Sequence, residues 1–168
     1  MHNVPSMVIS GGQTGADQAG LSVAKNYGIQ TGGFAPYDFM TTDGSNPSLK
    51  FFGLQETSFG YRERTLLNIE QADCTVIIAS NVNSPGTKTA VKHLKKLNKP
   101  YTIVCYNPDV SIYDWLYQSD LRRVMQMLDS FEHRPILNVA GNSSKTCPFS
   151  HLYSTFFLNL LFELITDV

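Results

Sequence analysis

Three segments of the sequence combine glycine with small hydrogen-bonding side chains, as phosphate-binding loops do. They are residues 10–15, which read Ser-Gly-Gly-Gln-Thr-Gly, residues 80–89 and residues 141–145. In such a loop, backbone N–H groups and the positive end of a following helix point at one place, where an anion can bind. The candidate ligand-binding residues of these loops are Ser10, Gly11, Gly12, Gln13, Thr14, Gly15, Ser84, Gly86, Thr87, Lys88, Thr89, Gly141, Asn142 and Ser143.

Positive side chains near these loops would help to hold an anion. Arg64 lies near the start of the predicted helix that precedes the strand at residues 74–79. An arginine there would supply a bidentate phosphate contact. Arg62 is a second candidate, and for both the alternative is an exposed arginine with no ligand. Each glycine loop taken alone also has a simpler interpretation, a turn that only lets a strand and a helix pack closely.

Several common chemistries are disfavoured by the same residues. The pattern GxxxxGK[ST] does not follow Gly11, which disfavours triphosphate hydrolysis, and residues 11–15 do not fit the GxGxxG of nicotinamide-binding folds. The four histidines are scattered without metal-ligand spacing, so we expect no metal site. Asp17, Asp43 and Glu56 are the nearest carboxylates that could act as a base, although Asp17 is also placed to cap the dipole of a helix.

The elements between the loops predict how they are positioned. Apolar runs at residues 7–9, 74–79, 101–105 and 136–140 alternate with segments of helical spacing. This pattern predicts one α/β domain over residues 1–168, a Rossmann-like open and mostly parallel sheet with helices on both faces. Ligands bind such sheets beyond the carboxyl ends of the strands, and all three loops leave such ends. We therefore expect the loops to converge on one phosphate-binding crevice.

Two segments are harder to interpret. Residues 34–60 carry turn signals and little periodicity, so they form either a ligand wall or a surface connection, with a short element near residues 51–54. Residues 112–128 have core spacing at Trp115, Val124 and Leu128, which predicts one helix.

Composition places the chain among ordinary globular proteins, with 42% hydrophobic and 16% charged residues. The formal net charge of −1 offers no long-range attraction to nucleic acid or to an anionic membrane, so we expect neither as a partner. Three cysteines without CxxC spacing indicate reduced thiols. Without a signal-peptide pattern or a membrane-spanning segment, we expect a cytoplasmic protein.

The sequence resembles the family of "putative molybdenum carriers", the circularly permuted relatives of YpsA. The opening residues 9–17 carry the most specific part of the resemblance, and it continues in order through Gly32-Gly33, Arg64-Thr65, Pro85-Gly86-Thr87 and residues 137–141. The resemblance implies a Rossmann-like fold of the superfamily that includes the LOG enzymes and the DprA proteins. It further implies a nucleotide or another phosphate-bearing ligand, or molybdenum cofactor itself, and assembly into a homo-oligomer.

The sequence also departs from that family. Residues 36–39 lack the basic run of many relatives and present Tyr37 and Phe39, which we expect to stack on the ligand. The LOG-type motif PGGxGTxxE has no glutamate counterpart after Pro85, which removes the obvious catalytic carboxylate. We therefore expect non-catalytic binding of a nucleotide-derived ligand, for example a cyclic ADP-ribose-type signal, or of a molybdopterin-type ligand, by a carrier, sensor or sponge. The alternative is a nucleotide N-glycosidase that uses Glu56 or Asp17, and a third interpretation is a protein-interaction domain.

Overall fold

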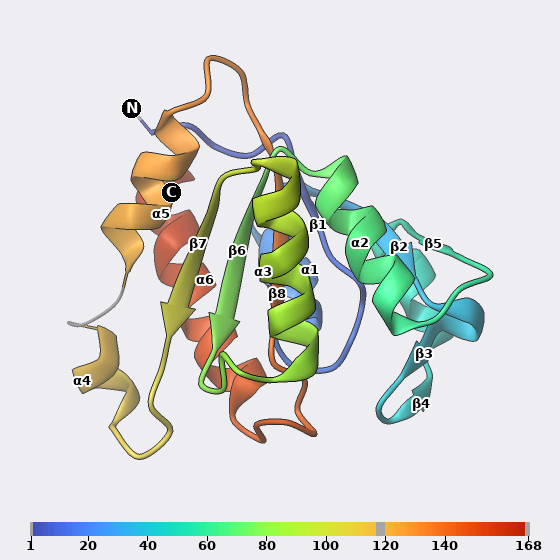
Figure 1. Ribbon diagram of the computed structural model, residues 1–168. Helices are drawn as coiled ribbons and strands as arrows, with labels where there is room; N and C mark the ends of the chain where they lie inside the picture. Colours follow the sequence, from blue (N-terminus) through green and yellow to red (C-terminus); the bar gives the residue numbers. More distant parts are fainter. Residues whose placement is uncertain (1, 117–119, 167–168) are drawn as a thin grey trace.

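The chain forms one six-stranded parallel sheet in the order β5-β2-β1-β8-β6-β7 (Figure 1). The computed structural model describes residues 2–116 and 120–166. The strands are β1 (Met7–Ile9), β2 (Gln30–Ala35), β5 (Leu54–Glu56), β6 (Cys74–Ala79), β7 (Tyr101–Cys105) and β8 (Ile136–Gly141). All pairings within this sheet are parallel. The predicted strands and the predicted Rossmann-like α/β class are confirmed.

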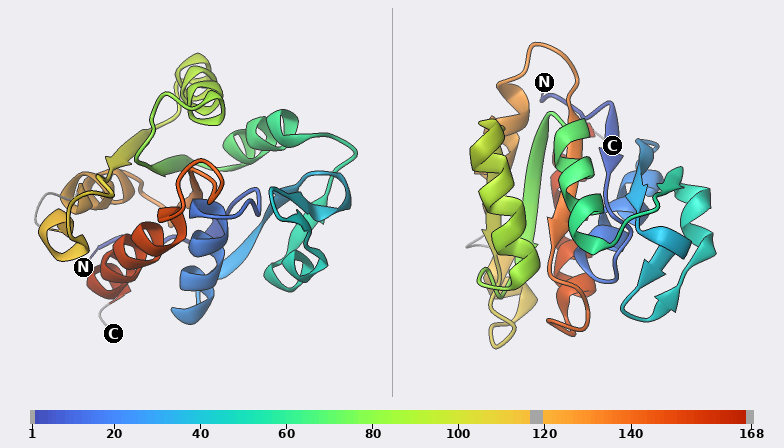
Figure 2. Two further views of the ribbon diagram at one scale, coloured as in Figure 1. Left: turned by 90° about the horizontal axis from the view of Figure 1, so that it is seen from below. Right: turned by 45° about the vertical axis from the view of Figure 1, so that its right-hand side comes forward.

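Helices cover both faces of the sheet, as the left view of Figure 2 shows along the strands. One layer holds α1 (Ala16–Asn26), α5 (Leu121–Asp129) and α6 (Ser150–Thr166), and the other holds α2 (Tyr61–Gln71) and α3 (Pro85–Leu97). The first layer shares a large core cluster with β1, β6 and β8, while Ile69, Ala90 and Leu94 pack on β6 from the second layer. Every residue of β6 is buried because this strand has neighbours on both sides and helices on both faces.

The helix α1 approaches the sheet very closely. A Cβ at Gly20 would stand 2.7 Å from the Cβ of Val139 in β8, so only glycine permits this packing distance. The helix ends at Asn26, two residues before Gly28, whose φ of 69° lies in the left-handed region, as the predicted glycine stop requires. The first loop is thereby held against the middle of the sheet.

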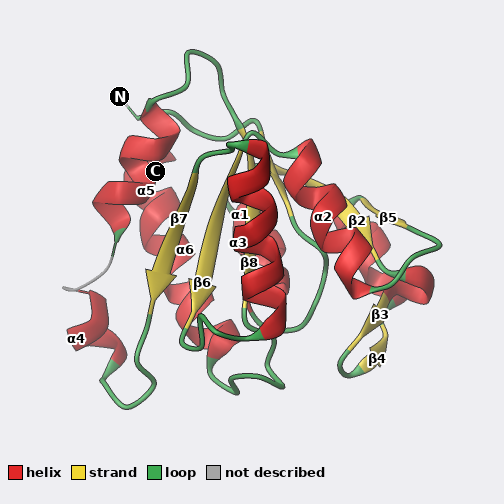
Figure 3. Ribbon diagram, in the orientation of Figure 1, coloured by secondary structure: helices red, strands yellow, loops and turns green. Residues whose placement is uncertain are grey.

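Residues 34–60 contain more regular structure than the sequence indicates (Figure 3). After β2 come a 3-10 turn η1 (Tyr37–Phe39), the small hairpin of β3 (Met40–Thr41) and β4 (Gly44–Ser45), a second 3-10 segment η2 (Pro47–Phe52) and then β5. The short element expected near residues 51–54 is the end of η2 and the start of β5. These pieces are stabilised by a small core, in which Phe39, Leu49 and Leu54 pack together with Leu21 of α1.

The helix predicted over residues 112–128 is described as two helices, α4 (Ile112–Leu116) and α5, and residues 117–119 of that prediction lie outside the described residues. Trp115, Val124 and Leu128 are buried, as their spacing predicted. Within the described part of the chain, no helix is long and apolar enough to span a membrane.

Candidate ligand-binding pocket

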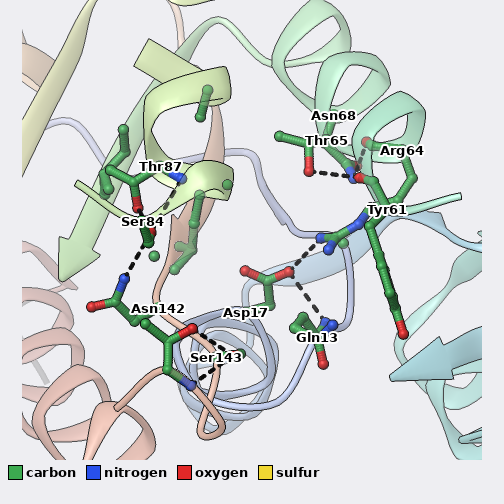
Figure 4. Close-up of a pocket in the computed structure, with 18 of the residues that line it drawn as sticks. Gln13, Asp17, Tyr61, Arg64, Thr65, Asn68, Ser84, Thr87, Asn142 and Ser143 are labelled. Carbon is green, nitrogen blue, oxygen red and sulfur yellow. Dashed lines mark hydrogen bonds and ion pairs between the residues drawn. The ribbon is translucent and has the colours of Figure 1, made fainter. Parts of the chain in front are cut away.

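The three predicted loops meet at the carboxyl ends of β1, β6 and β8 and enclose a pocket of about 240 Å³. Direct hydrogen bonds join them: Ala16 N–H donates to the carbonyl of Asn142 over 3.2 Å, and Ser144 N–H donates to Thr14 Oγ1 over 3.2 Å. Figure 4 shows Gln13, Asp17 and Arg64 on one side of the pocket and Ser84, Thr87, Asn142 and Ser143 on the other. The sheet therefore brings the loops together as their positions after the strands predict.

The pocket is organised around a buried ion pair. Arg64 Nη1, from α2, donates to Oδ2 of Asp17, from α1, over 2.7 Å. Arg64 is 8% exposed and Asp17 is 5% exposed. The guanidinium lies directly over the backbone of Gly11, where any Cβ would overlap Nη1. Gly11 is therefore needed for the arginine that crosses it.

Asp17 also accepts a hydrogen bond from the first loop. Gln13 N–H donates to Oδ2 of Asp17 over 3.2 Å. Burial raises the pKa of the Asp17 carboxyl, while the Arg64 guanidinium and the backbone N–H groups of Gln13 and Gly11 oppose that rise. The Asp17 carboxylate thus binds Gln13 N–H and Arg64, two groups that the sequence predicted to bind the anion of a ligand.

Two further N–H groups of this loop are engaged internally as well. Gly12 N–H donates to Ser10 Oγ over 3.3 Å, and Thr14 N–H donates to the side-chain oxygen of Gln13 over 2.9 Å. That same oxygen accepts from Thr42 N–H, which fastens the β3–β4 hairpin to the loop. Ser10, Gly12, Thr14 and Gly15 therefore shape the loop, and of its residues Gly11 and Gln13 line the pocket.

The second and third loops keep open donors. Ser84 is the N-cap of α3, and its Oγ accepts from Thr87 N–H, while Pro85 has no N–H to offer. Gly86 and Ser143 line the pocket, and the N–H group of neither has a hydrogen-bond partner among the described residues. Space is open beside Gly86, where an added Cβ would meet nothing within 4 Å. Each of these N–H groups can donate a hydrogen bond to one phosphate oxygen, and the dipole of α3 favours the negative charge there.

Asn142 connects the two loops rather than reaching outward. Its Oδ1 accepts from Ser80 N–H (3.0 Å) and Asn81 N–H (2.9 Å), and its Nδ2 donates to the Asn81 carbonyl (3.0 Å) and to Ser84 Oγ (3.4 Å). Two donors and two acceptor sites are all that an amide has. All hydrogen-bonding positions of the Asn142 amide are therefore occupied within the protein. The side chain acts as a clamp that fixes the position of the α3 N-terminus.

Besides Ser10, Gly12, Thr14 and Gly15, four further predicted ligand residues do not line the pocket. Phe39 is 4% exposed because it packs in the small core of residues 34–60, so its ring is not available for stacking, and Tyr37 is 67% exposed outside the pocket. Lys88 lines a separate groove with Val91 and Ile103, since it lies on the outer side of α3, and Thr89 lines neither. Glu56, the suggested base, accepts from Asp38 N–H away from the pocket.

The structure adds residues that the sequence analysis did not single out. Asn138 is 3% exposed in β8 and lines the pocket, with Nδ2 donating to Thr75 Oγ1 over 3.3 Å. The sequence feature that could have indicated Asn138 is its position as a single amide within an otherwise apolar strand. Tyr61 also lines the pocket, 43% exposed, with its ring 5.9 Å from the Arg64 guanidinium carbon. An aromatic side for a ligand thus comes from α2 and not from residues 36–39.

No arrangement of metal ligands is present in residues 2–116 and 120–166, where no three His, Cys, Asp or Glu side chains are placed to hold an ion. Cys74, Cys105 and Cys147 are all free thiols. The pocket itself is lined by hydroxyl, amide and backbone groups, by the Asp17–Arg64 ion pair and by apolar side chains such as Ile77 and Ala90. Such a lining suits hydrogen bonding to an organic ligand with an anionic group.

Comparisons with known proteins agree with this fold. The model of the circularly permuted YpsA SLOG family matches residues 8–161. The crystal structure at 1.45 Å resolution of a "Putative molybdenum carrier protein" from Syntrophus aciditrophicus SB is similar with a TM-score of 0.82 and 26% identity, over 96% of this chain and 97% of that chain. No curated protein gives a significant match. The family match covers all three loops and the ion pair, and the chain belongs to the circularly permuted YpsA SLOG family.

Proposed function

We propose that this protein binds a phosphate-bearing small molecule, derived from a nucleotide or a pterin, in the pocket between the three loops and does not consume it. The observation that carries the proposal is the buried Arg64, which has five N–H donors and a single hydrogen bond, to Asp17, within the described residues. Its Nε is buried without a partner. Nη2 has no partner either within the described residues and is not among the buried atoms, and the Arg64 side chain lines the pocket.

The phosphate group would lie between Arg64 and the N-terminus of α3. Gly86 N–H and Ser143 N–H supply neutral donors, and the hydroxyls of Ser143 and Thr146 line the same wall. The remaining lining is apolar at Ile77 and Ala90, which suits a planar ring. A volume of about 240 Å³ lies just below the range typical of small-molecule sites, roughly 300–1,000 Å³, and favours a mononucleotide-sized ligand over a dinucleotide.

A molybdopterin-type cargo fits this description in part. The similar protein from Syntrophus aciditrophicus carries the name of a molybdenum carrier. A pterin ring and a single phosphate would find the apolar wall and the donors of the pocket. The pocket lining holds no thiol, since Cys147 lies beside Thr146 but outside it, so metal binding would rest on the ligand's own atoms.

Turnover is the second candidate function, and the carboxylates argue against it. Asp17 is the one carboxylate that lines the pocket, and it already accepts from Arg64 and Gln13. A carboxylate held by a guanidinium at 2.7 Å is a poor nucleophile and a poor general base. Holding the ligand, as a carrier, sensor or sponge, is therefore the function that this set of residues supports best.

We further expect a cytoplasmic homo-oligomer. Free thiols, including the exposed Cys105, suit a reducing compartment. Phe149 and Leu152 at the start of α6 are about half exposed, so this end of the helix offers apolar surface to a second copy.

Isothermal titration tests the binding proposal, with nucleoside monophosphates, cyclic nucleotides, ADP-ribose and a molybdopterin source as titrants. We expect at least one to bind and Arg64→Gln to abolish that binding. Arg62→Gln is the matched control, because Arg62 lies two residues away, is exposed and only touches Glu63 at 3.9 Å. Absence of binding by every titrant, or equal binding by both variants, would contradict the proposal. Chromatography that shows a released base would favour the N-glycosidase instead.

A further inference from the structure

The charge balance of the pocket is neutral and is set by two residues. Of the residues that line it, Arg64 and Asp17 alone carry charge at neutral pH, and they form a pair at 2.7 Å. The other cations near the loops do not line the pocket: Lys88 lines the separate groove, and Arg62 and Lys145 are exposed side chains outside its lining. An anionic ligand therefore meets one guanidinium whose charge Asp17 already balances.

Arg64 nevertheless has more donors than the protein uses. Nη1 donates to Asp17, Nε is buried without a partner, and Nη2 is accessible and unpaired within the described residues, on a side chain that lines the pocket. A buried guanidinium with unused donors is costly unless a ligand acceptor completes it. The site thus favours hydrogen-bond acceptors on the ligand while it lacks surplus positive charge.

We propose that Asp17 is a charge selector, which makes the pocket accept a phosphate group carrying one negative charge and reject groups carrying two or more. This inference rests on the proposed function. The favoured ligand class is a phosphodiester, such as a cyclic mononucleotide, over a phosphomonoester or a diphosphate. Each added charge on the ligand faces the Asp17 carboxylate without a second cation to offset it, in a site where water screens little. A molybdopterin-type monoester binds in its singly charged form.

The wild-type protein provides a test that needs no mutation. The ligands are two series of nucleotides: cyclic AMP, AMP and ADP, and the corresponding guanine compounds. Within each series the nucleoside is the same and the phosphate charge differs. We expect the cyclic nucleotide to bind about tenfold more tightly than the monophosphate at about pH 7.5, and the diphosphate to bind more weakly still. A monoester has its second pKa near 6, so its affinity should rise between about pH 7.5 and about pH 5, while that of the cyclic nucleotide should stay constant.

Asp17→Asn tests the residue itself. Removing the carboxylate leaves Arg64 uncompensated, so affinity for the monophosphate should rise about tenfold and the order of preference should reverse. Glu63→Gln is the matched control, because it removes the same charge next to Arg64 from an exposed side chain that does not line the pocket. If Asp17→Asn does not fold, the nucleotide series on the wild-type protein still decides the proposal, because the order of affinities with ligand charge needs no variant.

The outcomes separate the two proposals. If neither nucleotide series nor the other titrants bind, the proposed function fails and the charge selector fails with it. If a ligand binds but the monophosphate and diphosphate bind as tightly as the cyclic nucleotide, the binding function stands and the charge selector is overturned. An equal response of Asp17→Asn and Glu63→Gln overturns it as well, because the effect would then come from overall charge.

Discussion

The guanidinium of Arg64 lies over the backbone of Gly11 so closely that a Cβ at position 11 would overlap Nη1. Gly11 belongs to the loop after β1 and Arg64 to α2, so this contact joins the first loop to a helix of the other layer. The ion pair with Asp17 depends on it, because the arginine reaches Asp17 across this glycine. Gly11 thus leaves the space that the Arg64 side chain needs to reach Asp17.

Gly11→Ala should displace Arg64 and weaken the protein. We expect a loss of about 1–3 kcal/mol in the free energy of unfolding, since the new methyl group forces side-chain and backbone shifts in a well-packed place, and a loss of ligand binding. Urea denaturation followed by circular dichroism measures the first effect. Gly86→Ala is the control for stability, because Gly86 is helical with open space beside it, and an unchanged or slightly higher stability is expected there. Equal stability of the two variants would contradict the contact.

The stabilising effects of Asp17 and Arg64 on the folded protein should be coupled rather than additive. Arg64→Gln leaves Asp17 buried without its partner and should cost about 3–5 kcal/mol, whereas Asp17→Asn with Arg64→Gln should recover part of that loss. A double-mutant cycle from chemical denaturation gives the coupling free energy between the two positions. Additive losses would show that the two residues do not interact in solution as they do in the structure.

Much of the fold follows from patterns in the chain, and the site follows only in part. A continuous apolar run such as that of β6 is typical of a central parallel strand, and the positions of the loops after such strands predict where they converge. Asp17 shows the limit. Its place in the first turn of a helix suggested a dipole cap, but its partner Arg64 is 47 residues away, and no local pattern reveals that pairing.

Phe39 shows a second limit. An aromatic residue in an irregular segment suggests a ligand contact, yet Phe39 packs with Leu49 and Leu54 from the same segment. The small core of that segment has neither the period of a helix nor that of a strand, because it is built from 3-10 turns and very short strands. Sequence periodicity cannot reveal a core that has no regular element to carry it.

Asn142 should control the spacing of the second and third loops. Asn142→Ala removes the acceptor for Ser80 N–H and Asn81 N–H, and we expect a loss of about 1–3 kcal/mol because these groups lose their partner. Hydrogen exchange of the Ser80 and Asn81 amides should accelerate more than exchange in β7. Asn98→Ala is a comparison, since Asn98 caps the far end of α3. Unchanged exchange at Ser80 and Asn81 would refute the clamp.

The cysteines should differ in reactivity. Burial raises the pKa of the Cys74 thiol to about 12, whereas Cys105 is exposed, so a thiol reagent at mildly alkaline pH should label Cys105 first and Cys74 only after unfolding. An unfolded Cys74 loses its proton at lower pH than the folded one. The free energy of unfolding should therefore fall as pH rises above about 9 toward about 12, and Cys74→Ala should reduce that slope. Peptide mass spectrometry of the labelled protein and alkaline denaturation curves measure both effects, and early labelling of Cys74 would contradict its burial.

Native mass spectrometry of the purified protein, with the ligand released by denaturation, tests most directly whether the pocket holds a phosphate-bearing molecule intact. We predict an adduct on the wild-type protein and on Arg62→Gln, none on Arg64→Gln, and release of an unbroken phosphorus-containing molecule. If added ligands leave the wild-type protein without an adduct, if Arg64→Gln retains one, or if only cleaved fragments are released, the protein does not hold its ligand as proposed.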